Sequence, residues 1–294
     1  MKKITSCWLG ATLLLAGINL AVAQENQDGV VPPPKVLTIF REFLKPGKGG
    51  GAHEKAESAF VQAMAQAKWP THYFAVNSLS GKSRALFLTP YDSFEAWEKD
   101  SLAVQKNATL AAALDRAAAN DGELLSETDS TVLVYNEDQS LRGPVAIAHM
   151  RYFEISLYRV KPGHRNEWGE LVKLVKAAYE KLPDSHWAMY EAVYGQEGVT
   201  YAVFVPLKSA SEIDRNFAQD KDFAAAMGED GMKKLGELEA SAIEFSQTNL
   251  FQFSPKMSYP PDAWVKADPD FWKPKAAAAP KAKAASEEKP AAKP

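Results

Sequence analysis

The sequence predicts an α+β fold made of two tandem βαββαβ units within one chain. A β-like run that ends in Lys-Pro-Gly occurs at residues 39–47 and again at 155–163, 116 positions later. Each run is followed by the same order of strand and helix patterns. The offset stays between 114 and 117 in the pairs His72/His186 and Gly81/Gly198. A nearly constant offset across separated anchors indicates an internal duplication.

The first unit is expected to begin with a strand over 36–44 that Pro46 ends. A helix over 53–68 follows, because Phe60, Met64 and several alanines recur at three- and four-residue steps, and Pro70 stops it. The remaining expected elements are strands at 73–79 and 84–88, helices at 93–99 and 102–120, and a strand at 131–135.

The second unit repeats this order. Its helix over 167–182 is amphipathic, with Leu171, Leu174, Val175 and Ala178 on one face, and Pro183 stops it. The remaining expected elements are strands at 150–160, 187–194, 200–205 and 245–253, and helices at 209–217 and 220–238.

A βαββαβ unit is the ferredoxin-like split motif, whose antiparallel sheet carries helices on one face only. The bare face must be covered, and two units in one chain can cover each other. With its Lys-Pro-Gly strand ends and duplication, the chain resembles the dimeric α/β-barrel superfamily, which includes the antibiotic-biosynthesis-monooxygenase-like proteins. The resemblance spans about residues 35–253 and implies an intrachain pseudo-dimeric barrel. It also implies a cavity between sheet and helices in each half. Members include cofactor-independent oxygenases, haem-binding or haem-degrading enzymes, isomerases and proteins of no known activity.

The chain is expected to divide into seven segments. These are a signal peptide (1–23), a linker (24–34), a first barrel half (35–137), a linker (138–149), a second half (150–254), an aromatic and Pro-containing extension (255–272), and a disordered Ala/Lys/Pro tail (273–294).

Export is predicted by the basic start Lys2-Lys3, an apolar run, and Ala21-Val22-Ala23 before a cleavage point. Periplasmic or extracellular localisation is therefore expected, with no membrane span after cleavage. The only cysteine is Cys7, so the mature chain would lack disulfides. The formal net charge of −3 gives no electrostatic reason to expect a nucleic-acid partner.

Familiar metal and cofactor motifs are missing from the sequence. Without an HxxxH or HExxH pattern no metal site is expected, and no cofactor is predicted; haem is an option that no motif supports. His72 and His186 open the second strand of each unit and could act as a general base or ligate haem iron. Alternatively, each imidazole hydrogen-bonds the end of the preceding helix.

Alternation along the first strand of each unit places Glu154, Ser156 and Tyr158 on one face, which we expect to be an inner face. The same face of the first unit carries Thr38, Phe40 and Glu42. Glu154 and Tyr158 could orient a substrate hydroxyl or accept its proton. Alternatively, they form a buried hydrogen-bonded pair.

The two copies disagree at three paired positions: Phe40/Ser156, Arg41/Leu157 and Glu42/Tyr158. These are the positions at which the halves are expected to have diverged in function. Asn77 and Glu191, on the second strands, complete the set of pocket candidates.

Three functions remain open from the sequence. The first is binding or oxidation of a small molecule in a barrel pocket, with a cofactor-independent monooxygenase-like activity as the enzymatic version. The second is a non-catalytic scaffold or interaction module whose barrel is packed solid by Phe40, Tyr73, Phe74, Met189 and Phe251. The third is haem binding. The chain is expected to be a monomeric pseudo-dimer or a weak homo-oligomer.

Overall fold

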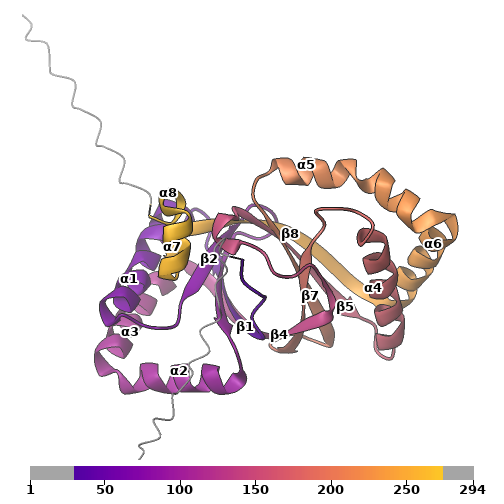
Figure 1. Ribbon diagram of the computed structural model, residues 1–294. Coiled ribbons are helices and arrows are strands. Elements are labelled where there is room, and N and C mark those ends of the chain that lie inside the picture. The colour runs from indigo at the N-terminus through magenta and orange to yellow at the C-terminus, as the bar shows by residue number, and fades with distance from the viewer. Residues whose placement is uncertain (1–29, 274–294) are drawn as a thin grey trace, which may run out of the picture.

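A computed structural model describes residues 30–273 (Figure 1). The predicted signal peptide (1–23) and nearly all of the predicted tail (273–294) lie outside the described residues. Of the predicted linker (24–34), the last five residues are described, and Val31 pairs with Val145 in an isolated antiparallel bridge.

Eight strands form one closed barrel in the order β1-β3-β2-β8-β5-β7-β6-β4. All neighbouring strands are antiparallel. The strands are β1 (Val36–Leu44), β2 (Tyr73–Ser78), β3 (Arg84–Tyr91), β4 (Leu125–Leu141), β5 (Tyr152–Val160), β6 (Trp187–Tyr194), β7 (Val199–Leu207) and β8 (Ile243–Tyr259).

The barrel is pseudo-dimeric, as predicted. The first half contributes β4-β1-β3-β2 and the second half contributes β8-β5-β7-β6 in the equivalent order. Pairing of β2 with β8 and of β4 with β6 joins the halves. The bare faces of the two units therefore meet inside a single closed sheet, which leaves no free sheet edge.

Helices of the two halves cover opposite sides of the barrel (Figure 1). The first half contributes α1 (Gly51–Ala67), α2 (Phe94–Lys106) and α3 (Ala108–Gly122); the second contributes α4 (Arg165–Tyr179), α5 (Ser211–Ala218) and α6 (Asp220–Ala242). The remaining helices are η1 (Ile147–His149), α7 (Asp262–Ala267) and α8 (Pro269–Trp272). No helix in the described part of the chain is long and apolar enough to cross a membrane.

The last strand of each half is longer than predicted. The strand expected at 131–135 runs from Leu125 to Leu141 and enters the segment expected to be a linker. The strand expected at 245–253 runs from Ile243 to Tyr259, beyond the expected end of the second half at 254. Both extensions pair with the other half, Leu141 with Trp187 and Tyr259 with Tyr73. The halves are therefore joined both by these extensions and by the predicted parts of the two strands, for example Val134 with Glu191 and Phe253 with Val76.

The side of β5 that was predicted to face the barrel interior faces the helices instead. Phe153 and Ile155 belong to the main apolar cluster inside the barrel, and Leu157 packs against it. Tyr158 instead packs into the apolar cluster beneath the helices of the second half. Alternation along a strand therefore points Glu154, Ser156, Tyr158 and their counterparts toward the helix layer.

The barrel interior is mostly filled. Of the side chains expected to fill it, Phe74 and Phe251 do so; Tyr73 and Met189 belong to other clusters, and Phe40 is exposed. Trp264 and Trp272 of the C-terminal extension join the same interior cluster. The remaining cavity at the level of Arg41 and Arg84 is only about 50 Å³.

Candidate functional site

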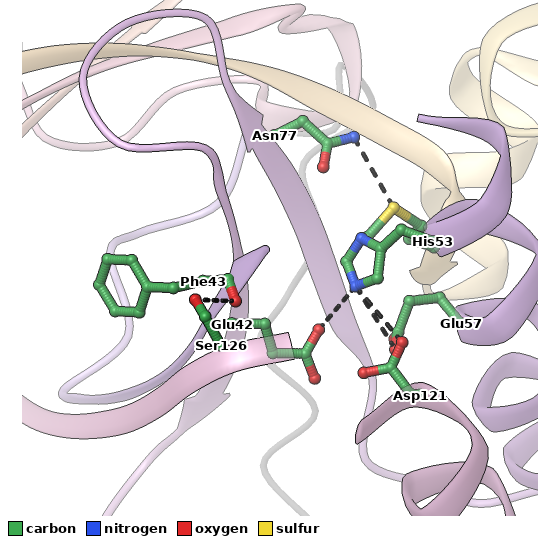
Figure 2. Close-up of polar contacts among 8 residues, drawn as sticks. Glu42, Phe43, His53, Glu57, Asn77, Asp121 and Ser126 are labelled. Atoms are coloured by element: carbon green, nitrogen blue, oxygen red, sulfur yellow. Dashed lines mark hydrogen bonds and ion pairs between the residues drawn. The ribbon is translucent and has the colours of Figure 1, made fainter. Parts of the chain in front are cut away.

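Four polar side chains come together between the barrel and the helices of the first half (Figure 2). Glu42 lies near the end of β1, and Asp121 lies near the end of α3. His53 and Glu57 lie on α1, four residues apart, which places them on the same helix face. One strand and two helices thus each present ligand-type side chains to the same space.

The imidazole of His53 is at the centre of this buried cluster of Glu42, His53, Glu57 and Asp121. Its Nε2 lies 2.9 Å from Glu42 Oε2, 3.6 Å from Asp121 Oδ1 and 4.0 Å from Glu57 Oε1. Only the contact with Glu42 is a hydrogen bond. Figure 2 shows Glu42 on one side of the ring nitrogen and both Glu57 and Asp121 on the other.

Water has almost no access to the cluster. The four residues are between 1% and 4% exposed. Glu42, Glu57 and Asp121 are also the only buried acidic residues in the described part of the chain. Carboxylates are rarely buried without a compensating charge, because desolvation of the ionised form is costly.

The electrostatics of the cluster favour protonation of two of its carboxyl groups. Burial, followed by the charges of Glu42 and Asp121, raises the pKa of Glu57 to about 10. Burial and then Glu42 raise the pKa of Asp121 to about 6, although His53 acts in the opposite direction. Without another positive charge the cluster therefore retains at least one proton at neutral pH.

Several oxygen atoms around the cluster have no partner. Glu57 Oε1, Asp121 Oδ1 and the Tyr73 hydroxyl are buried and make no hydrogen bond with any described residue. Burial and then the charges of Glu57 and Glu42 raise the pKa of Tyr73 well above its ordinary value. Unpaired buried polar atoms are rare in folded proteins, and two unpaired carboxylate oxygens within one cluster indicate a missing partner.

The ligand set fits a metal ion. One ligand atom from each residue can be chosen so that all four lie within 4.8 Å of one another. Ligand atoms bound at about 2.1 Å from one ion are at most about 4.2 Å apart, so a small contraction would complete coordination. One imidazole nitrogen and three carboxylate groups suit Mn(II), Fe(II) or Zn(II) better than a soft ion such as Cu(I).

The predicted candidate His72 lies outside this cluster. Its ring is 4.7 Å from that of Tyr259, and its Nδ1 is buried without a partner among the described residues. Burial lowers the pKa of His72, partly opposed by a backbone hydrogen bond with Tyr259 and by the charge of Asp262. His72 also borders a pocket of about 370 Å³.

Its counterpart His186 has both ring nitrogens within 2.9 Å of backbone carbonyl oxygens, those of Asp184 and Pro206. The alternative considered from the sequence is a hydrogen bond to the end of the preceding helix; His186 instead contacts the turn after α4 and the strand β7. This geometry leaves neither nitrogen of His186 free for iron or substrate.

The predicted residues of the second half do not form a polar site. Burial raises the pKa of Glu154 and that of Tyr158. The Tyr158 ring lies 5.4 Å from that of Trp168, and Ser156 shares a 2.7 Å hydrogen bond with Thr248. No hydrogen bond links Glu154 to Tyr158 in the described structure.

The remaining predicted pocket residues are dispersed. Thr38 donates a 3.4 Å hydrogen bond to the Thr89 carbonyl, and Phe40 is 43% exposed. The Asn77 amide approaches the Met257 sulfur at 3.7 Å. Glu191 pairs with Arg165 at the surface. Of the ten predicted residues, only Glu42 belongs to the buried cluster.

Sequence reasoning missed His53, Glu57 and Asp121. A local signal existed for two of them, because His53-x-x-x-Glu57 places two possible ligands on one helix face. The HxxxH and HExxH patterns need a second histidine four positions on, where this chain has Glu57. Asp121 follows Glu42 by 79 positions and reaches it only through packing of α3 on the sheet, which no local pattern shows.

The chain matches no protein-family model and no curated protein. Solved structures share its arrangement of elements. A protein named "putative monooxygenase" from Fusobacterium nucleatum gives a TM-score of 0.47 at 12% identity, covering 75% of this chain and 93% of its own. An anthrone oxidase-like protein gives 0.48 at 16% identity, covering 76% and 94%. Chlorite dismutase from Candidatus Nitrospira defluvii gives 0.44 at 10% identity, covering 79% and 94%. Likeness at this level carries no argument about ligand or reaction, so the fold assignment rests on the strand order of the barrel.

Proposed function

We propose that this protein is an exported metal-binding barrel that holds one divalent transition-metal ion between the sheet and helices of its first half. The observation that carries the proposal is the convergence of Glu42, His53, Glu57 and Asp121, all buried, around unpaired carboxylate oxygens. The export part rests on the N-terminal sequence pattern.

Charge balance supports a metal ion over an ion pair within the cluster. Three carboxylates face one imidazole, so even a protonated His53 leaves an excess of negative charge in a buried site. Such a site is stable only if protons or a cation neutralise it. A divalent ion would replace the proton on Glu57 and provide a partner for the unpaired oxygens of Glu57 and Asp121.

The chemistry of the four ligand side chains limits which metal ions suit the site. Carboxylate oxygens suit Mn(II), whereas the imidazole nitrogen also suits Fe(II) and Zn(II). Because Zn(II) generally binds such sites more tightly than Mn(II) or Fe(II), supply in the compartment would decide which ion is present. An iron or manganese ion would supply redox chemistry, which differs from the cofactor-independent oxidation that was one of the three functions left open by the sequence.

Metal binding can be tested on the full mature chain after dialysis against a chelator. Titration with Mn(II), followed by the loss of its free-ion paramagnetic resonance signal, is expected to give one tight site. His53→Gln and Glu57→Gln each remove one ligand, and we expect at least a tenfold loss of affinity from each.

Glu154→Gln is the matched control, since Glu154 is also a partly buried carboxyl whose pKa is raised, yet it lies in the second half. It should bind Mn(II) as the wild type does. A folded wild-type protein that binds no Mn(II), Fe(II) or Zn(II), or unchanged affinity in both ligand variants, would contradict the proposal.

A further inference from the structure

A second pocket in the first half lies apart from the buried cluster. It has a volume of about 370 Å³ and is bordered by the start of β2, the end of β3 and the start of α7. This volume falls within the usual range for small-molecule sites. None of the four cluster residues lines this pocket, although Tyr73 does, so ligand binding in it does not require a metal ion in the buried cluster.

Aromatic side chains form much of its wall. Tyr91 and Trp264 line it, together with Tyr73 and Phe74. Trp264 is held by ring contacts with Phe74 at 5.6 Å and Trp272 at 5.3 Å. Faces of such rings carry negative electrostatic potential and attract cations, most strongly at tryptophan.

The wall is held in place by a partly buried acceptor, Asp100. Asp100 accepts hydrogen bonds from Trp69 Nε1 at 2.8 Å, the Thr71 hydroxyl at 2.6 Å and the Tyr91 hydroxyl at 3.0 Å. All three donors are neutral, and Asp100 makes no ion pair with a described residue. Its negative charge therefore lies behind the wall without a compensating cation, while it fixes the position of the Tyr91 ring.

The polar groups of the pocket also favour positive charge. Asp92 is exposed at its rim, and the charge of Asp262 acts on the neighbouring His72. Burial holds the pKa of His72 below its ordinary value, which favours the neutral imidazole. The site thus combines four aromatic side chains with the carboxyl group of Asp92, and no Lys or Arg of the described chain lines it.

From this combination we propose that the pocket beside His72 binds an organic cation of the quaternary-ammonium class. Aromatic faces suit a diffuse, weakly hydrated positive charge, and proline rings in the wall suit its methyl groups. A small inorganic cation would instead need several converging oxygen ligands, and the pocket lining provides only Asp92 and Thr71 beside His72 and the Tyr hydroxyls.

Two probes distinguish the effect of the ligand's charge from the effect of its shape. Choline and its uncharged isostere 3,3-dimethyl-1-butanol have nearly the same size, so titration calorimetry on the full mature chain can compare them directly. We expect choline to bind saturably and the isostere to bind at least threefold more weakly, as expected for a cation–π site.

Single substitutions then test whether choline binds in the pocket beside His72. Asp92→Asn lies at an exposed rim position and should weaken choline binding about threefold or more without affecting folding. Trp264→Leu should weaken it further, with circular dichroism confirming that the variant is folded.

The matched control is Asp138→Asn. Asp138 lines another pocket of about 370 Å³ that contains Glu137 and Glu191 but a single aromatic residue, Tyr135. Choline affinity should not change in this variant. Absence of saturable binding, equal binding of the isostere, or equal losses in Asp92→Asn and Asp138→Asn would overturn the proposal, the last because it would indicate attraction to acidic surface in general.

Discussion

The two halves of the barrel share one backbone plan but fill the space beneath their helices with opposite chemistry. Glu42 of β1 pairs with Ala85, whereas its counterpart Tyr158 of β5 pairs with Tyr201. On the helices, the buried residues His53 and Glu57 correspond to Trp168 and Val172 at a constant offset of 115, which also relates Ala63 to Ala178. The first half therefore places Glu42, His53 and Glu57 at positions where the second half has Tyr158, Trp168 and Val172.

The side chains beneath the helices differ between the two halves in size as well as in polarity. Ala75 and Ala85 form the sheet surface of the first half, and Met189 and Tyr201 occupy the equivalent strand positions in the second. The Trp168 ring stacks on that of Tyr201 at 4.9 Å. Small residues therefore lie on the sheet of the first half, while large ones occupy the corresponding positions of the second. If the first half holds a metal ion as proposed, duplication has left one copy to provide stability and the other to bind a ligand.

The largest expected effect concerns the second half. Trp168 is 2% exposed at the centre of the apolar cluster under α4 and α6. Trp168→Ala should lower the free energy of unfolding by about 3–5 kcal/mol, because it leaves a cavity in a packed core. Urea unfolding with and without Mn(II) should give the same loss. A loss below about 1 kcal/mol would show that this layer is not the structural core assumed in the comparison.

Metal should stabilise the first half by mass action. At a free Mn(II) concentration 100-fold above Kd, the free energy of unfolding should rise by about 2.7 kcal/mol. Thermal unfolding with Mn(II) and with a chelator measures this difference within each variant. His53→Gln should abolish the difference, whereas Glu154→Gln should retain it. If Mn(II) stabilised both variants equally, the metal would not be bound by the buried cluster.

The pH dependence of the metal-free protein tests the raised pKa of Glu57. The folded state keeps this proton up to about pH 10, whereas the ordinary value is 4.5. The stabilisation from this raised pKa is fully present below the ordinary value and is lost as pH rises through the folded value. The slope attributable to Glu57 is at most about 1.4 kcal/mol per pH unit. Subtracting the profile of Glu57→Gln isolates this slope, and identical profiles would show that Glu57 does not bind the extra proton.

The smallest expected effect comes from replacing one first-half residue with its second-half counterpart. Glu57→Val introduces the residue found at the corresponding position, Val172, and removes an unpaired buried oxygen. Without metal, its free energy of unfolding should lie within about 1 kcal/mol of the wild type, since removal of an unsatisfied polar group offsets lost packing. Affinity for Mn(II) should nevertheless fall. A loss above about 3 kcal/mol in chelator would assign Glu57 a structural role instead.

Sequence reasoning predicted the repeat and the barrel because these depend on local signals. Gly47 and Gly163, after the two repeated strands, have φ angles of +75° and +86°, a backbone region that favours glycine. Glu42 was found because it differs from Tyr158 at paired positions. The layer assignment was wrong because alternation distinguishes two faces but does not tell which one the helices cover.

The rest of the cluster could not be derived from local pattern. His53 and Glu57 interrupt the apolar face of α1. From the sequence alone, this interruption indicates only an imperfect amphipathic helix, because the pattern does not show that both side chains lie near Glu42. Asp121 completes the cluster only when α3 packs on the sheet beside α1. The C-terminal extensions of β4 and β8 were missed for a similar reason, since Leu141 and Tyr259 pair with residues of the other half, whereas the N-terminal extensions pair within their own half.

The most direct test of the account is an anomalous-diffraction measurement on crystals of the mature protein soaked in Mn(II). We expect one strong anomalous peak bonded to Glu42, His53, Glu57 and Asp121 at about 2.0–2.2 Å, the range for such nitrogen and oxygen ligands. No peak is expected among Tyr158, Trp168 and Val172. An ordered crystal without a peak at the first-half cluster, or with one of equal strength in the second half, would contradict the account.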